Sequence, residues 1–172
     1  MNKVWIKRTM MIAALVLIAT ACNSDQIYKH ITSFKDYRWQ RLSEDKKSGN
    51  AIEFTDVEVK NNADPYDVLI GIRHSGVINV DKIQLLIDIV APSGTKRSSV
   101  HTIKLKDRAG TKFIGDVMGD MYDIEERVKA YMSFTETGKY TIRITNMSSV
   151  FEIVGIIDMT LRIVKSDLDY NI

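Results

Sequence analysis

The sequence predicts an all-β protein: a single antiparallel β-sandwich, immunoglobulin-like or jelly-roll-like, that follows an N-terminal leader. Between residues 51 and 166, short runs of alternating apolar residues recur, as in half-buried strands. Turn-forming sequences such as Ala91-Pro92-Ser93-Gly94 and Glu136-Thr137-Gly138 separate these runs. Only Asp120 to Arg127 (DMYDIEER) has a pattern that suits a helical turn or short helix. A single domain without internal repeats is therefore expected.

The chain begins with the layout of a secretory signal peptide. Lys3, Lys7 and Arg8 form a basic start, an apolar run follows over residues 10–18, and small residues occupy positions 19–21. The apolar run is shorter than the roughly 20 residues that a transmembrane helix needs. Residues 1–21 are therefore predicted to be a signal peptide that is removed, with its basic flank on the cytoplasmic side.

Cys22, the only cysteine in the chain, directly follows these small residues. The segment from Ile18 to Cys22 (IATAC) resembles a bacterial lipobox, although Ala19 stands where leucine is usual. In lipobox proteins the cysteine thiol receives a diacylglycerol, and the peptide is cut just before that cysteine. The alternative is an ordinary cleavage site with an incidental cysteine beside it. Because two or more acyl chains hold a protein stably on a bilayer, the lipobox predicts an anchored chain that does not span the membrane.

Residues 22–50 are predicted to comprise the lipidated cysteine, a tether and a packing arm. Asn23 to about Lys29 is mostly polar and suits a short tether. The segment from Phe34 to Trp39 is predicted to pack on the domain as a first strand or extended arm. Trp39 has two interpretations, a packing aromatic or an exposed ligand platform, and the first is favoured because most tryptophans are largely buried.

The sandwich is predicted over residues 51–166, with residues 167–172 as a C-terminal tail. AIEFTDVEV alternates Ile52 and Phe54 and then shifts phase to Val57, as a β-bulge would produce. Residues 82–91 keep five alternate apolar positions in phase and carry apolar residues on the other face too, which favours a central strand. Further inward-facing positions are predicted at Val68, Ile70, Ile72, Ile103, Leu105, Val128, Ala130, Met132, Phe134, Tyr140, Ile142, Ile144, Met159, Leu161 and Ile163.

The histidine and aspartate residues of the sequence do not form a pattern that predicts a catalytic, metal or cofactor site. His74 and His101 have no metal-ligand neighbour two or four residues on. His74 is interpreted as a surface or strand-end residue, and His101 as a residue on a solvated strand face. Asp116, Asp120 and Asp123 lie close in sequence but lack the spacing of a calcium loop, so a solvated acidic loop is favoured.

The charge gives no reason to expect nucleic acid as a partner. The formal net charge is +2, from 24 basic and 22 acidic residues. The predicted signal peptide contains three of the basic residues and no acidic one, so the remaining chain is close to neutral with its signs interspersed.

Six segments follow the lipobox in this order: YRWQ, ADPYDVLIGIRHSG, IQLLIDIVAPSGTK, AGTKFIGDVMGDMYD, TETGKYTIRITNM and VGIIDMTLRIVK. Together they resemble the gliding motility lipoprotein GldH family over nearly all of the mature chain. The resemblance rests chiefly on Pro65, Tyr66, Ile72 and Arg73, on the turn Pro92 to Gly94, and on the stretches Gly138 to Ile142 and Val154 to Ile163. Asn146 to Phe151 departs from the family pattern.

The resemblance implies a cell-envelope lipoprotein of gliding bacteria, a non-enzymatic part of the motility apparatus that is linked to type IX secretion. It implies lipid attachment at Cys22, a position on the periplasmic side of the outer membrane, and other envelope proteins as partners. It carries over no catalytic residue, metal or cofactor.

An alternative function is a surface or periplasmic glycan-binding lipoprotein. In that case Trp39, Tyr66 and Tyr122 would converge on a concave, exposed patch that contacts the ligand or partner. A third interpretation is a hydrolase, which would require a nucleophile and an acid around His74 or His101.

Overall fold

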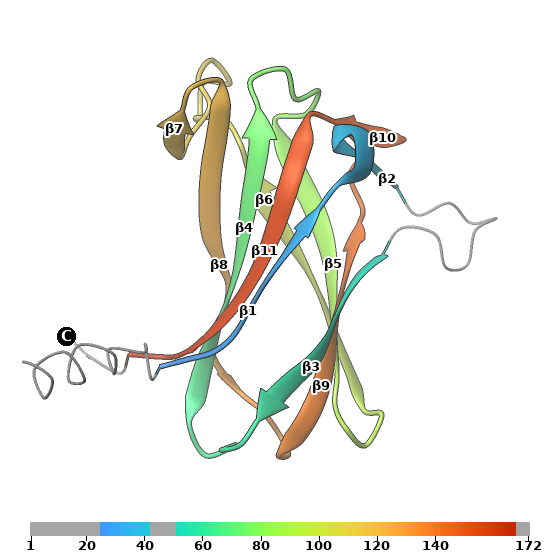
Figure 1. Ribbon diagram of the computed structural model, residues 1–172, viewed down its shortest axis with the longest axis vertical. Coiled ribbons are helices and arrows are strands. Elements are labelled where there is room, and N and C mark those ends of the chain that lie inside the picture. The colour runs from blue at the N-terminus through green and yellow to red at the C-terminus, as the bar shows by residue number, and fades with distance from the viewer. Residues whose placement is uncertain (1–24, 42–50, 168–172) are drawn as a thin grey trace, which may run out of the picture.

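The computed structural model describes residues 25–41 and 51–167, which form two antiparallel β-sheets packed face to face (Figure 1). The five-stranded sheet has the order β1-β11-β4-β8-β7, the four-stranded sheet has the order β3-β9-β5-β6, and β10 and β2 form a separate ribbon. The predicted all-β antiparallel sandwich is therefore confirmed. The elements are β1 (Gln26–Ser33), the 3₁₀ turn η1 (Lys35–Tyr37), β2 (Arg38–Gln40), β3 (Ala51–Val59), β4 (Pro65–Ser75), β5 (Lys82–Val90), β6 (Lys96–Lys104), β7 (Asp116–Met118), β8 (Met121–Ser133), β9 (Gly138–Asn146), β10 (Glu152–Val154) and β11 (Ile156–Lys165).

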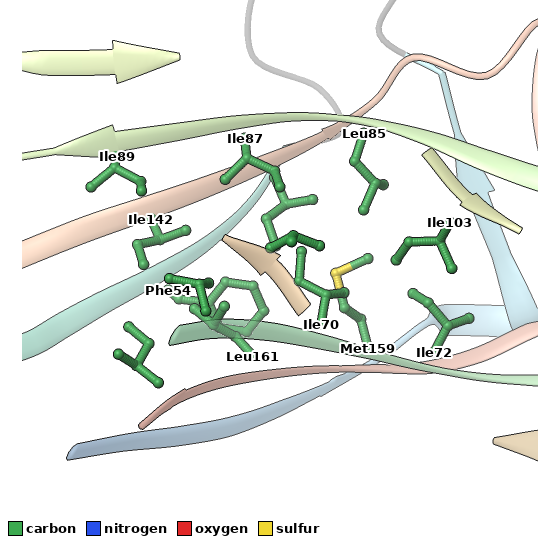
Figure 2. Close-up of a cluster of buried hydrophobic side chains, with 14 of the residues drawn as sticks. Phe54, Ile70, Ile72, Leu85, Ile87, Ile89, Ile103, Ile142, Met159 and Leu161 are labelled. Atoms are coloured by element: carbon green, nitrogen blue, oxygen red, sulfur yellow. The ribbon is translucent and has the colours of Figure 1, made fainter. Parts of the chain in front are cut away.

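The core lies between the two sheets and is built from alternate residues of each strand (Figure 2). On β4, Val68, Ile70 and Ile72 are buried while their neighbours Leu69 and Gly71 are partly exposed. Successive side chains of a strand point to opposite faces, so this alternation leaves one face of each sheet for the interior. Burial of each large aliphatic side chain stabilises the fold by about 1.5–3 kcal/mol.

Two predicted features of the four-stranded sheet are confirmed. The strand β5 lies between β9 and β6, as its two apolar faces indicated. The strand β3 contains the predicted bulge, because its register with β9 shifts between Phe54 and Val57. Asp56 sits in the bulge with a φ of 59° and places Val57 and Val59 back in the core.

Three predictions at the level of strands are wrong. The segment that was predicted as a tether up to Lys29 is already part of β1 from Gln26, which pairs with β11 at the edge of the five-stranded sheet. The stretch from Asp120 to Arg127 is not helical, since β8 begins at Met121. Ala130 is exposed, because β8 shifts its register with β4 on either side of Val68 and so leaves the simple alternation.

The strands run between two ends of the molecule, which we call the base and the tip. β1 begins at the base, where Gln26 lies opposite Val164 and where Tyr66 pairs with Lys165. The base carries the short loops at residues 60–64, 91–95 and 134–137, and the tip carries the longer segments 34–41, 76–81, 105–120 and 147–155 (Figure 1). In the described part of the chain, no helix has the length and apolar character to cross a membrane.

Candidate functional site at the tip

The predicted site residues do not form one patch. Cys22 lies outside the described residues. Trp39, near the tip, is buried and its ring centroid lies 5.2 Å from that of Phe34, which confirms the packing interpretation. Tyr66 is buried at the base, where its hydroxyl donates a hydrogen bond to the backbone oxygen of Asn61 at 2.7 Å. Tyr122 is partly buried at the tip, so the three rings offer no common face for a sugar to stack on.

The tip is held together by backbone hydrogen bonds between segments that are far apart in the sequence. The N–H of Gly76 donates to the oxygen of Asp120 at 2.9 Å, and the N–H of Ser75 donates to the oxygen of Gly155 at 2.8 Å. The N–H of Gly155 donates in turn to the oxygen of Tyr37 at 2.8 Å. The loop after β4, the β7–β8 turn, η1 and the β10–β11 junction are therefore linked in one hydrogen-bonded framework.

Gly155 makes this junction compact. Its φ is +94°, a conformation that side chains rarely adopt, and a β-carbon there would lie 2.8 Å from Ser75 Oγ and 2.9 Å from Ile78 Cα. Only glycine fits the position without displacing the loop that follows β4.

The ribbon of β2 and β10 is fixed to the sandwich by buried contacts. Trp39 pairs with Ile153, and both side chains are in the core. The buried Asn146 donates from Nδ2 to the backbone oxygen of Trp39 at 3.1 Å and accepts from the N–H of Ser148 at 2.9 Å. Because the amide of Asn146 uses both its donor and its acceptor, the ribbon has a defined position at the tip.

Large apolar side chains are exposed around this framework. Five of the eight large apolar side chains that are exposed in the described residues lie on segments of the tip, and none lies on the loops of the base. Val77 is 79% exposed and Phe151 is 71% exposed, although both would usually be at least half-buried. The five are Tyr37, Val77, Val117, Met118 and Phe151.

Behind this surface, His74 is enclosed in an aromatic cluster. Its ring stacks on Tyr122 with centroids 5.4 Å apart and meets Phe113 edge-on at 4.9 Å. Its Nδ1 lies 2.9 Å from the oxygen of Ser75, so Nδ1 carries the proton and Nε2 is the bare nitrogen. Nε2 is buried without a hydrogen-bond partner in the described structure. Burial lowers the pKa of His74, an effect opposed by the Ser75 oxygen and the Asp123 carboxylate.

This position differs from the one predicted for His74. It is at the end of a strand, as expected, but its ring is fully buried rather than at the surface. Ser75 Oγ bonds to the backbone oxygen of Gly155 and not to the imidazole, so no nucleophile–base pair forms there. His101 is partly buried on β6, with its Nε2 2.8 Å from Glu126 Oε1, rather than free in solvent.

Two acidic residues near the tip, Asp123 and Asp158, are paired with the guanidinium of Arg73. Asp123 receives two hydrogen bonds from Arg73, at 2.7 and 2.8 Å, and Asp158 lies 3.8 Å from the same guanidinium. The hydrogen bonds from Arg73 lower the pKa of Asp123, and Asp123 raises the pKa of Arg73. Within the described ranges, no three acidic, histidine or cysteine side chains are grouped to hold a metal ion.

Two hollows of the described surface are open to solvent, and polar and apolar groups line each in similar measure. One of about 270 Å³ lies on the outer face of the five-stranded sheet, where Gly71 has no side chain, between Lys29 and Arg73. Another of about 450 Å³ lies beside the tip and is lined by Gln84, Thr102 and Ser148 among others. Neither is lined by an aromatic ring. A third hollow, of about 340 Å³ at the base, has Tyr66 in its lining, but Tyr66 is only 1% exposed and so presents no ring face for a sugar to stack on. The arrangement therefore suits contact with a protein surface better than capture of a sugar or other small molecule.

Sequence reasoning did not identify the exposed apolar residues of the tip. Val77 follows the Ser75-Gly76 turn, and Val117 and Met118 lie between Gly115 and Gly119. Valine and methionine stand here in connections bounded by glycine, where polar residues are usual, and this is the sequence signal of the exposed apolar residues.

Comparison with known proteins adds one finding. A family model described as GldH lipoprotein matches residues 26–163, which span β1 to most of β11. A search of curated proteins finds no match to the chain.

Proposed function

The chain belongs to the GldH lipoprotein family, and from this premise we propose that it is a non-enzymatic component of the gliding motility machinery that is linked to type IX secretion. Membership makes it a gliding-associated lipoprotein of the cell envelope. The observation that carries the proposal is the match itself, which extends over both sheets of the sandwich and over the segments that build the tip.

The geometry supports a binding role over a catalytic one. In the described structure neither His74 nor His101 is hydrogen-bonded to a nucleophile: His74 Nδ1 faces the backbone oxygen of Ser75, and His101 Nε2 lies against Glu126. What the molecule does present is a rigid sandwich with exposed apolar side chains at one end. Such surfaces mark contacts with other proteins.

We place the protein at the outer membrane, on its periplasmic side, anchored through acyl chains on Cys22. The lipobox-like sequence before Cys22 supports the anchor, and membership of the GldH lipoprotein family supports a position in the cell envelope. A lipid anchor restricts the domain to a thin layer at the membrane and so raises its effective concentration for envelope partners.

Deletion of the gene in a gliding host tests the proposal. We expect loss of colony spreading and of single-cell gliding, together with reduced export of type IX cargo proteins, and recovery of all three when the wild-type gene is restored. Normal gliding in the deletion strain would overturn the motility role. Lost gliding with unchanged cargo export would overturn the link to secretion while leaving the motility role in place.

A further inference from the structure

We propose that the tip is the docking site for a protein partner that stands away from the anchoring membrane and receives the exposed apolar side chains in an apolar recess. This inference rests on the proposed function, because it uses the lipid anchor at Cys22 to define which end of the sandwich faces the membrane. It adds the surface, the orientation and the kind of partner.

The predicted anchor at Cys22 defines which end of the domain is nearer the membrane. Cys22 is four residues before Gln26, and four residues reach at most about 14 Å. Gln26 is at the base, so the base is held near the bilayer. β4 has 11 residues and rises about 3.3 Å per residue from base to tip, which places the tip about 35 Å farther out.

Most of the exposed large apolar side chains of the described residues lie at the tip, the end far from the predicted anchor. Tyr37, Val77 and Phe151 are each more than half exposed and lie on tip segments that are joined through Gly155, Asn79 and the ribbon. Val117 and Met118 lie on the neighbouring β7, beside the turn at Asp120 that bonds to Gly76. The remaining exposed large apolar residues, Ile31, Val100 and Tyr131, stand singly on three different strands.

The candidates to bind this surface are the anchoring bilayer, a second copy of the chain and a different protein. The anchoring bilayer is nearest the base, so a partner that approaches from the side away from the membrane meets the tip first. A second copy anchored in the same leaflet points in the same direction, so the outward ends of the two tips do not face each other. A different protein that extends to this height is the occupant that satisfies both constraints.

The chemistry of the tip describes the recess that fits it. Phe151 and Tyr37 are aromatic side chains of the kind that serve as anchors in protein interfaces, and Val77 and Met118 are smaller apolar groups at the same end. The backbone hydrogen bonds of the tip fix the loops before binding, which reduces the entropy lost on association.

The experiment introduces a photo-crosslinking amino acid at Phe151 of the full-length protein in its own cells, and at Tyr131 as a control of similar exposure on β8. We expect an adduct with another protein from position 151 and not from position 131. A second change at the tip, Val77→Ser, should lower the yield of that adduct about tenfold, as loss of a neighbouring interface contact does. The matched change Val100→Ser, on β6, should leave the yield unchanged.

Each other outcome would overturn the proposal. An adduct of twice the chain's own mass would identify a second copy, a lipid adduct would identify the bilayer, and equal adducts from positions 151 and 131 would indicate chance collisions. An adduct insensitive to Val77→Ser would contradict a single docking surface that includes both Val77 and Phe151. Since the adduct is measured without reference to gliding, it can fail while the deletion phenotype still supports the proposed function, and the reverse.

Discussion

At the scale of single residues, His74 is the side chain whose environment departs most from what its type would suggest. A fully buried imidazole with a bare, unpartnered Nε2 can hold no second proton without paying a desolvation cost. The sequence indicated a strand end, which is right, but Phe113 and Tyr122 enclose the ring from segments 39 and 48 residues away. Burial of this kind follows from tertiary packing and leaves no mark in the local pattern.

The pH dependence of stability follows from that environment. The folded-state pKa of His74 lies below its ordinary value of 6.5, so the unfolded chain binds the proton more readily. Stability from this residue is therefore fully present above pH 6.5 and is lost as the pH falls below it, with a slope of at most about 1.4 kcal/mol per pH unit. His74→Phe keeps an aromatic ring and removes the titration.

The measurement is urea unfolding of the wild type and of His74→Phe between pH 7.5 and pH 5. We expect the free energy of unfolding to fall more steeply with decreasing pH in the wild type. Val100→Ser, a change on β6 that removes no titratable group, is the control and should keep the wild-type slope. Parallel curves for the wild type and His74→Phe would contradict the assignment of a lowered pKa.

At the scale of strands and loops, alternation of apolar residues predicted most of the fold. It failed where the period of two is interrupted or faint. The irregular register of β8 moves Ala130 outward, and β1 is an edge strand with Lys29, His30 and Ile31 all partly or largely exposed, so its pattern is weak. The β3 bulge was predictable because apolar residues resume in phase on both sides of it.

Gly155 sets the geometry of the tip, and its replacement gives a prediction at this scale. Gly155→Ala introduces both a strained positive φ and a steric clash with the loop after β4. Gly94→Ala, in a turn at the base with a φ of +86°, introduces the strain alone because nothing lies within 4 Å. We expect a loss of about 1 kcal/mol for Gly94→Ala from the left-handed conformation, and about 1–3 kcal/mol more for Gly155→Ala from overpacking.

Denaturant unfolding of the two variants at neutral pH checks this difference. Equal losses would mean that the tip relaxes around the new methyl group, and the framework of hydrogen bonds at Gly155 would then be looser than its geometry indicates.

At the scale of the whole molecule, the sandwich and the family that the sequence predicts are confirmed, the anchor at Cys22 stays a prediction, and the tip was not predicted as a site. The tip consists of residues from four separate segments, and only the strand order brings Tyr37, Val77 and Phe151 to one end. Trp39, Tyr66 and Tyr122 were reasonable candidates by residue type. Their rings pack in the core or against neighbouring rings. A single sequence does not distinguish an aromatic residue that packs in this way from one that binds a ligand.

The attachment of the whole molecule to the membrane is tested by replacing Cys22. Cys22→Ser removes the thiol that would carry the diacylglycerol, so we expect loss of lipid labelling and release of the chain from the membrane fraction, with the sandwich still folded. Metabolic labelling with a fatty-acid analogue and membrane fractionation measure the two effects. Unchanged membrane retention of Cys22→Ser would rule out Cys22 as the anchor.

The placement of β1 also determines how the domain would carry tension. A pull between the membrane and a protein held at the tip enters the sandwich at Gln26 and acts along β1, which pairs with β11 over most of its length. The hydrogen bonds of an antiparallel pair are perpendicular to the strands, so this load shears them together instead of opening them one after another. The strand nearest the anchor is thus joined to the sheet in the direction of greatest mechanical resistance.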